Sequence, residues 1–258
     1  MRSMVRWAAR CLALVVYLGA TGLAHAAADD KAIGAALASK DRLDGDAAED
    51  AWRNPQAVLN FLGVHAGQHT LDYFAAAGYY SELLSRVVGP TGSVIVYNNP
   101  GYAEFAGTKL TERVTSARLP NAHMVTTPTD ALKLQPASLD SVLFVLSYHD
   151  LYWTPKGEKG PLGAAKQVTA DLFKALKKGG VVVVVDHAAR PGSDTATVVN
   201  AMHRIDPQKV KDDFARAGFS FDEASNALRH PDDDLSKPVF DESIRHKTDQ
   251  FILRFRKP

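Results

Sequence analysis

Short apolar stretches alternate with amphipathic segments from residue 69 to the end of the chain. HTLDY (69–73), SVIVYN (93–98) and, more weakly, HMVTT (123–127) have the length and residue types of strands. LDSVLFVLS (139–147) and VVVVVD (181–186) are apolar on both faces, which is typical of strands covered by helices on two sides. The pattern predicts a buried, mostly parallel sheet.

The segments between these strands have helical periodicity. Helices are predicted at AGYYSELLSRVVG (77–89), GAAKQVTADLFKALKKGG (163–180) and PQKVKDDFARAGF (207–219). In the second of them, Lys177 and Lys178 are expected in the last helical turn, where cations interact favourably with the helix dipole. Because strand, helix and strand repeat, the crossovers are expected to be right-handed and the sheet to lie between two helical layers.

The two ends of the chain differ from this middle. FSFDEAS (219–225) and DQFILRFRK (249–257) alternate in the manner of a terminal antiparallel hairpin. Residues 27–60 are rich in Ala, Asp and Leu and are predicted to form a helical extension. We therefore expect one α/β domain, three-layered and doubly wound, over residues 61–258.

Residues 1–26 have the pattern of an export signal. Three arginines precede an almost uncharged apolar stretch, and Ala24-His25-Ala26 supplies the small residues that a signal peptidase requires. The sequence favours cleavage and export to the periplasm, without stable membrane association afterwards. An uncleaved membrane anchor is the alternative.

Charge and cysteine content exclude several classes of function for the exported chain. Removal of residues 1–26 leaves 27 basic against 29 acidic residues, a net charge of −2, and no basic patch indicates nucleic-acid binding. The only cysteine is Cys11, so the remainder has no disulfide, thiolate zinc site or cysteine nucleophile. A small-molecule substrate is the expected partner, and the oligomeric state is not indicated.

Four polar breaks follow the predicted strands: the turn after Asp72, Asn98, SYHDLYW (147–153) and DHAARPG (186–192). In open α/β sheets, ligands bind beyond the carboxyl ends of the strands, where the strand order reverses. We expect these four segments to line one cavity.

Several of these stretches together resemble the class I S-adenosylmethionine-dependent methyltransferases. The resemblance rests on the turn with Asp72 and Gly78, YYSELLSRVVGPTGSVIVYN (79–98), the apolar fourth strand and the final hairpin. More narrowly, the chain is similar to a group of exported predicted methyltransferases that share SYHDLYW, VVVVVDHAARPG, HRID and FDESIRHKTDQF. The resemblance implies a Rossmann-like sheet of seven strands, S-adenosylmethionine as cofactor and methyl transfer to a small molecule.

The resemblance also assigns the cofactor contacts. The superfamily pattern Asp-x-Gly-x-Gly-x-Gly falls on Asp72, Phe74, Ala76 and Gly78, so two glycines are replaced. Phe74 either turns its ring away or occupies part of the ligand's place. At the end of the second strand Asn98 replaces the acid that accepts the ribose hydroxyls, and neutral hydrogen bonds are roughly half as strong as charge-assisted ones. Asp130 is the candidate acid after the third strand.

The fourth and fifth strands are neighbours in this fold. Their ends are expected to bring the candidate catalytic residues together: Tyr148, His149, Asp150, Asp186 and His187. Methyl transfer needs mainly alignment, and a base only when the acceptor is a hydroxyl or a protonated amine. A histidine next to a carboxylate suits that task, because imidazole titrates near neutral pH.

Further residues are expected to contact the substrate. Tyr152 and Trp153 are predicted to form a pocket wall, and Arg190 lies in the neighbouring polar break. The charged loop 230–249 is interpreted as a flap, with Arg245 as a contact to an anionic ligand.

Two other functions remain open. One is a ligand-binding protein that has kept the methyltransferase scaffold without its chemistry, which would explain Phe74 and Asn98 together. The other is a metal-assisted enzyme built from the His149-Asp150 and Asp186-His187 pairs, because imidazole and carboxylate suit several divalent ions. His203 could join either arrangement.

Overall fold

The computed structural model describes residues 28–258 of the chain. The predicted export signal lies outside the described residues. Within residues 28–258, no helix has the length and apolar character that a membrane crossing requires.

Seven strands form one sheet in the order β3-β2-β1-β4-β5-β7-β6. The strands are β1 (His69–Tyr73), β2 (Ser93–Asn98), β3 (Ala122–Thr126), β4 (Leu139–Val145), β5 (Leu176–His187), β6 (Ser220–Ser225) and β7 (Gln250–Arg256). The first five are parallel, and β7 lies antiparallel between β5 and β6. The predicted α/β class, the seven-stranded mostly parallel sheet and the antiparallel carboxyl-terminal strands are confirmed.

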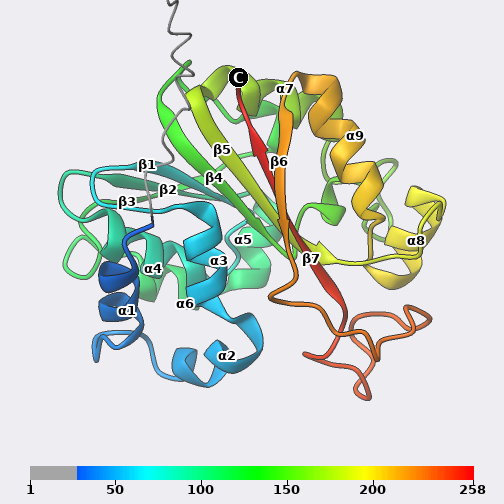
Figure 1. Cartoon of the computed structure of the whole chain (residues 1–258), viewed down its shortest axis with the longest axis horizontal. Helices are drawn as coiled ribbons and strands as arrows, with labels where there is room; N and C mark the ends of the chain where they lie inside the picture. The colour runs from blue at the N-terminus through cyan, green and yellow to red at the C-terminus, as the bar shows by residue number, and fades with distance from the viewer. Residues whose placement is uncertain (1–27) are drawn as a thin grey trace, which may run out of the picture.

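Helices cover both faces of this sheet (Figure 1). They are α1 (Asp30–Leu37), α2 (Asp46–Arg53), α3 (Pro55–Leu62), α4 (Tyr79–Val88), α5 (Pro100–Ala106), α6 (Thr108–Arg113), α7 (Ala165–Ala175), α8 (Thr195–Met202) and α9 (Pro207–Ala217), with 3₁₀ turns η1 (Thr129–Ala131) and η2 (His149–Leu151). Buried side chains of α1, α3, α4 and α6 form one apolar cluster, and those of α7, α8 and α9 form a second on the other face.

Strand β5 shows why the central strands are apolar throughout. Val181, Val183 and Val185 belong to the first cluster, whereas Val182 and Val184 belong to the second. Successive side chains of a strand point to opposite faces, so a strand covered on both sides must be apolar at every position.

One predicted helix end was wrong. Helix α7 ends at Ala175, and Lys177 and Lys178 belong to the start of β5. Two contacts favour the extended conformation there: Leu176 pairs with Leu139 of β4, and Lys177 Nζ donates to Asp140 at 2.7 Å. A cross-strand pair and an ion pair outweigh the helix-dipole preference, which is typically below 1 kcal/mol.

The strand order places the site. From β1 the chain moves outward through β2 to β3 and then returns to β4 on the other side of β1. The carboxyl ends of β1 and β4 therefore flank the point where the order reverses, which is where open α/β sheets bind ligands.

Candidate functional site

The turn after β1 keeps the backbone shape of a glycine-rich turn, although only one of the three glycines in the pattern is present. Phe74, Ala76 and Gly78 have φ angles of 55°, 48° and 76°. For a residue with a Cβ this left-handed conformation costs roughly 1–2 kcal/mol. The surrounding structure must therefore hold Phe74 and Ala76 in place.

Contacts from α6 hold this turn from behind. Arg113 is fully buried and donates through Nε to the Ala77 carbonyl at 2.7 Å. A Cβ at Gly78 would lie 2.9 Å from Leu110 Cδ1 and 3.1 Å from Arg113 Cδ. Glycine is required at position 78 by both its backbone angle and this close packing.

The Phe74 ring lies within an aromatic stack. It is parallel to the Tyr102 ring of α5 at 4.4 Å, with 9° between the planes, and stacks on Tyr97 at 5.7 Å. Phe74 is 3% exposed. Its ring is therefore packed at the carboxyl edge of β1 and β2, and is not turned out into solvent.

Asn98 is bonded back onto the same turn. Its Oδ1 accepts from the Ala76 N–H at 2.9 Å, and its Nδ2 donates to the Ala76 carbonyl at 3.0 Å. The side chain is fully buried. The methyltransferase pattern has a ribose-binding acid at this position. Here both polar groups of the Asn98 amide are hydrogen-bonded to the protein backbone.

The two candidate carboxylates of this region are differently placed. Asp72 is buried and accepts a 2.5 Å hydrogen bond from Ser81 Oγ of α4. Burial raises the pKa of Asp72 to about 6, although the Ser81 bond opposes the shift. Asp130 lies exposed in η1.

At the ends of β4 and β5 the structure gathers His149, Asp150, Asp186 and His203, which we call the His149 cluster. Asp186 is fully buried; one oxygen accepts from the His149 N–H at 2.8 Å and the other lies 2.7 Å from His149 Nδ1. Because the carboxylate can only accept there, Nδ1 carries the hydrogen and the other ring nitrogen, Nε2, faces the rest of the cluster.

Two further polar atoms lie close to that nitrogen. His149 Nε2 lies 3.3 Å from Asp150 Oδ1 and 3.3 Å from His203 Nδ1, and the latter two atoms are 3.5 Å apart. Asp150 is 7% exposed, yet its Oδ1 has no hydrogen-bond partner. Its other oxygen accepts from the Tyr102 hydroxyl.

Electrostatics in the cluster favour a positive charge on His149. Burial opposes that charge, but the carboxylates of Asp186 and Asp150 outweigh burial and raise the pKa of His149 to about 9. Burial raises the pKa of Asp150, but the nearby rings of His149 and His203 and the hydrogen bond from Tyr102 outweigh burial and lower it.

His187 lies beside the cluster but is held separately. Its Nδ1 is 2.8 Å from Thr248 Oγ1, and its ring centroid is 6.1 Å from that of His149. Burial and the neighbouring cation of His149 lower its pKa well below the usual value. His187 is thus neutral. The predicted ligand set of His149, Asp150, Asp186 and His187 does not converge as a whole: His203, and not His187, joins His149 and Asp150.

The structure does not bring Tyr148 and Tyr152 to the cluster. Both hydroxyls donate to Asp213 Oδ2 of α9, from Tyr148 at 3.1 Å, and Lys209 pairs with the same carboxylate. These tyrosines connect η2 and the turn after it to α9.

Trp153 does reach the cluster. The Trp153 ring lies 5.2 Å from that of His203. Phe240, on the loop between β6 and β7, lies with its ring 5.0 Å from the His203 ring. Phe240 is 67% exposed. The two aromatic rings therefore flank the most accessible member of the cluster.

The loop predicted to be a flap is anchored from below. Arg204 is fully buried and pairs with Asp233 at 2.8 Å, and Arg190 donates to the Asp234 carbonyl at 3.1 Å. Arg245 lies exposed next to His246, whose ring contacts Trp52 of α2. Neither Arg190 nor Arg245 has a recorded contact with the His149 cluster among the described residues.

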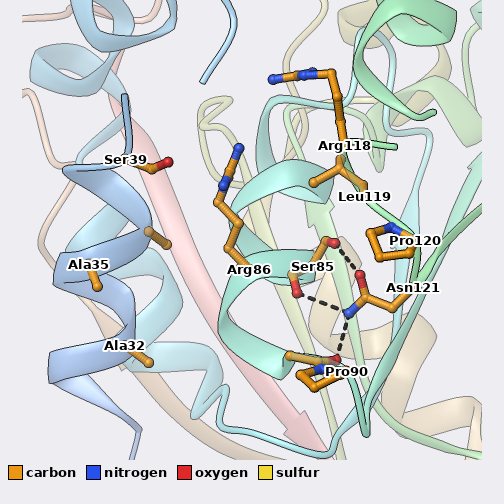
Figure 2. Close-up of a pocket in the computed structure, with 12 residues that line it drawn as sticks. Ala32, Ala35, Ser39, Ser85, Arg86, Pro90, Arg118, Leu119, Pro120 and Asn121 are labelled. Atoms are coloured by element: carbon orange, nitrogen blue, oxygen red, sulfur yellow. Dashed lines mark hydrogen bonds between the residues drawn. The ribbon is translucent and has the colours of Figure 1, made fainter. Parts of the chain in front are cut away.

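A cavity of about 490 Å³ lies away from this site, between α1, the end of α4 and the segment before β3 (Figure 2). Asn121 spans its floor, donating to the carbonyls of Ser85 and Gly89 at 3.0 and 2.7 Å. Its two cations, Arg86 and Arg118, are both paired with Glu82. The hollow is at the amino end of β2, opposite the edge where ligands gather.

Solved structures that are similar to this chain include S-adenosylmethionine-dependent methyltransferases and a cyclase. A methyltransferase from Aquifex aeolicus has a TM-score of 0.57 at 15% identity, covering 81% of this chain and 93% of its own. Phosphoethanolamine N-methyltransferase 2 from Haemonchus contortus, in complex with S-adenosylmethionine, has 0.55 at 16%, covering 80% and 53%. The [4+2]-cyclase SpnF has 0.55 at 14%, covering 81% and 82%.

No protein-family model and no curated protein sequence matches the chain. At 14–16% identity the structural similarity establishes a methyltransferase-type fold and not the reaction.

The residues at the turn do not fit S-adenosylmethionine as they stand. The Phe74 ring is packed over the turn where the superfamily has no side chain, and Asn98 occupies the Ala76 N–H. The N–H groups of Ala75 and Gly78 bond to the carbonyls of Tyr97 and Ala75. These three backbone donors are therefore already used within the protein, and Asn98 stands in place of the acid for the ribose.

Proposed function

We propose that this protein binds a small molecule at the His149 cluster. We also propose that the turn after β1 does not bind S-adenosylmethionine. One observation carries the proposal. At the turn after β1, Phe74 stacks on Tyr102 and Asn98 is hydrogen-bonded to the Ala76 backbone, whereas Asp150 Oδ1 in the His149 cluster is buried without a hydrogen-bond partner.

The fold itself permits this reassignment. SpnF, described as a [4+2]-cyclase, has the same type of fold as the methyltransferases. A scaffold therefore does not restrict a chain to one reaction, and the residues of the site must decide. The His149 cluster lies at the carboxyl ends of β4 and β5, beside the reversal of strand order between β1 and β4 where open α/β sheets bind ligands.

A second candidate is S-adenosylmethionine-dependent methyl transfer to a small molecule, with His149 near the acceptor. One observation favours it: Phe74, Ala76 and Gly78 still have the positive φ angles of a glycine-rich cofactor turn. For this function the Phe74 ring must leave its stack on Tyr102 and release the space that it fills.

The setting of the protein is part of the proposal. Residues 1–26 have the pattern of a cleavable signal, and the remainder carries a net charge of −2 without cysteine. These features support work in the periplasm on a small molecule, without a nucleic-acid partner.

Calorimetry with S-adenosylmethionine separates the two candidates. The wild-type protein is expected to give no binding heat and no shift in Tm at 1 mM cofactor. The Phe74→Gly, Asn98→Asp double variant is expected to bind, because glycine opens the turn and the carboxylate restores charge-assisted bonds to the ribose. Asn98→Asp alone is expected to remain silent because the ring still blocks the site.

Wild-type binding in the micromolar range would overturn the first candidate and favour the second. The single variant Phe74→Gly is the steric control: binding roughly tenfold weaker than that of the double variant is expected, the difference between neutral and charge-assisted ribose bonds.

A further inference from the structure

The distances within the His149 cluster are those of a metal-binding site. His149 Nε2, Asp150 Oδ1 and His203 Nδ1 lie 3.3, 3.3 and 3.5 Å apart. Ligands about 2.1 Å from a tetrahedral zinc ion are separated by about 3.4 Å, whereas octahedral ligands at that length are about 3.0 Å apart. The triangle has the tetrahedral size.

We propose that His149, Asp150 and His203 bind a divalent metal ion, Zn²⁺, through these three atoms, and leave a fourth position open. Among residues 28–258 this is a set of three ligating side chains whose atoms converge on one point. Two imidazoles and one carboxylate with an open position are typical of catalytic zinc. The inference rests on the proposed function, since it supplies the chemistry of that same site.

The hydrogen bonds around the three atoms orient them toward one point. Asp186 accepts the Nδ1 hydrogen of His149, so Nε2 faces the cluster, and a metal ion bound there would displace the proton from Nε2. Tyr102 donates to one oxygen of Asp150 and leaves Oδ1 unpaired. A network made only of hydrogen bonds would give Oδ1 a donor, and a buried carboxylate oxygen without one is costly.

The same neighbours orient the ligands in the way that metal sites require. Metal-binding histidines usually donate their second ring nitrogen to a carboxylate, and ligating carboxylates are themselves hydrogen-bonded. Asp186 does this for His149, at 2.7 Å, and Tyr102 does it for Asp150. These two residues are positioning residues.

His203 is held by its backbone. It follows α8 as the C-cap with φ of 53°, a left-handed conformation unusual for a residue with a Cβ. Its ring lies between Trp153 and Phe240. Residues in such conformations cluster at functional sites. The conformation costs free energy, so the surrounding structure must fix it.

Access comes from the His203 side. The side chain of His203 is 19% exposed, against 4% for His149 and 11% for Asp150. The open position is therefore expected to face solvent next to Phe240, where a water molecule or a substrate oxygen can complete the coordination.

Metal content and zinc titration of the untagged, full-length protein test the proposal. One zinc ion per chain is expected after purification without chelator, and none after dialysis against a strong chelator. Returning Zn²⁺ to 100 times its dissociation constant is expected to raise Tm by roughly 5–10 °C. Co²⁺ in its place should give the visible absorption of a tetrahedral site.

Two variants with conservative shapes test the ligands. Asp150→Asn keeps an acceptor for Tyr102, and His203→Asn keeps a residue that tolerates positive φ. Each is expected to weaken zinc binding at least 100-fold while circular dichroism shows the native fold. His123→Ala, at an exposed histidine of β3, is the matched control and should bind zinc as the wild type does.

Wild-type protein that takes up neither Zn²⁺ nor Co²⁺ would overturn the inference, as would ligand variants that bind zinc normally. Neither result depends on S-adenosylmethionine. Zinc binding by a protein that also binds S-adenosylmethionine would uphold the metal site and overturn the proposed function, so the two failures are distinguishable.

Discussion

Two neighbouring parts of the carboxyl edge of the sheet differ in how their polar groups are paired: the end of β1 and β2, and the end of β4 and β5. At the β1–β2 end, Asn98 and the backbone of Ala76 satisfy one another and the Phe74 ring fills the remaining space. At the β4–β5 end, Asp150 Oδ1 and His149 Nε2 face each other at 3.3 Å without a hydrogen bond between them. The first end is complete without a ligand, and the second is not.

This difference shows why fold similarity alone does not locate a ligand site. A binding site needs donors and acceptors that the protein leaves unused, because pairing within the protein removes the gain from binding. The scaffold resembles methyltransferases at both ends, but only the β4–β5 end retains such groups. Tyr102 contacts both ends, since its ring stacks on Phe74 and its hydroxyl donates to Asp150.

The largest effect is expected from breaking the β4–β5 end. Asp186→Ala leaves the N–H groups of His149 and His187 and the His149 ring nitrogen without their acceptor. Removing one partner of a buried charged pair costs about 3–5 kcal/mol. Urea unfolding should show that loss in the free energy of unfolding.

Asp186→Asn is the control for this variant. It keeps an acceptor for the backbone N–H groups, so a smaller loss is expected. A loss below about 1 kcal/mol for Asp186→Ala would mean that the cluster is loosely held, contrary to the buried geometry.

A pH titration sharpens the comparison at the β1–β2 end. The folded pKa of Asp72 is about 6, above its ordinary value of 3.8, mainly because the carboxyl is buried. The folded state therefore binds the proton more tightly, so the stabilisation is complete below pH 4 and is lost as pH rises through 6. A rise of the pKa from 3.8 to about 6 corresponds to about 3 kcal/mol of stability.

The measurement is the difference in unfolding free energy between wild type and Asp72→Asn at several pH values. The amide still accepts from Ser81 and cannot ionise. Wild type should lose about 2.5 kcal/mol relative to the variant between pH 4 and pH 7. A constant difference would show that Asp72 titrates normally and is reached by water.

The sequence was sufficient for the regular elements of the sheet. HTLDY and SVIVYN coincide with β1 and β2, because apolar strands bounded by turn residues carry their own signal. Helices α5, α6 and α8 were not predicted; they are short, six to eight residues, and their stability depends on packing that periodicity does not report.

The site was predictable in location and less so in detail. Parallel strand ends had to bring His149, Asp150 and Asp186 together. Tyr102 was missed because nothing in the local sequence of α5 indicates a contact with Phe74 and Asp150, 28 and 48 positions away. Tyr148 turns to Asp213 because the 3₁₀ turn η2, and not strand alternation, sets the direction of side chains there.

The smallest effect is expected at the residue that joins the two ends. Tyr102→Phe keeps the ring that stacks on Phe74 and removes the hydroxyl that donates to Asp150. The loss of one hydrogen bond to a carboxylate should lower the unfolding free energy by about 1.5–3 kcal/mol in full burial, and by about 1–2 kcal/mol where Asp150 can turn toward His203.

Combined with Phe74→Gly, the two losses should add within about 0.5 kcal/mol, because the altered hydroxyl does not touch Phe74. A coupling above 1 kcal/mol would show that the β1–β2 and β4–β5 ends act as one unit, and that opening the turn after β1 also disturbs the His149 cluster.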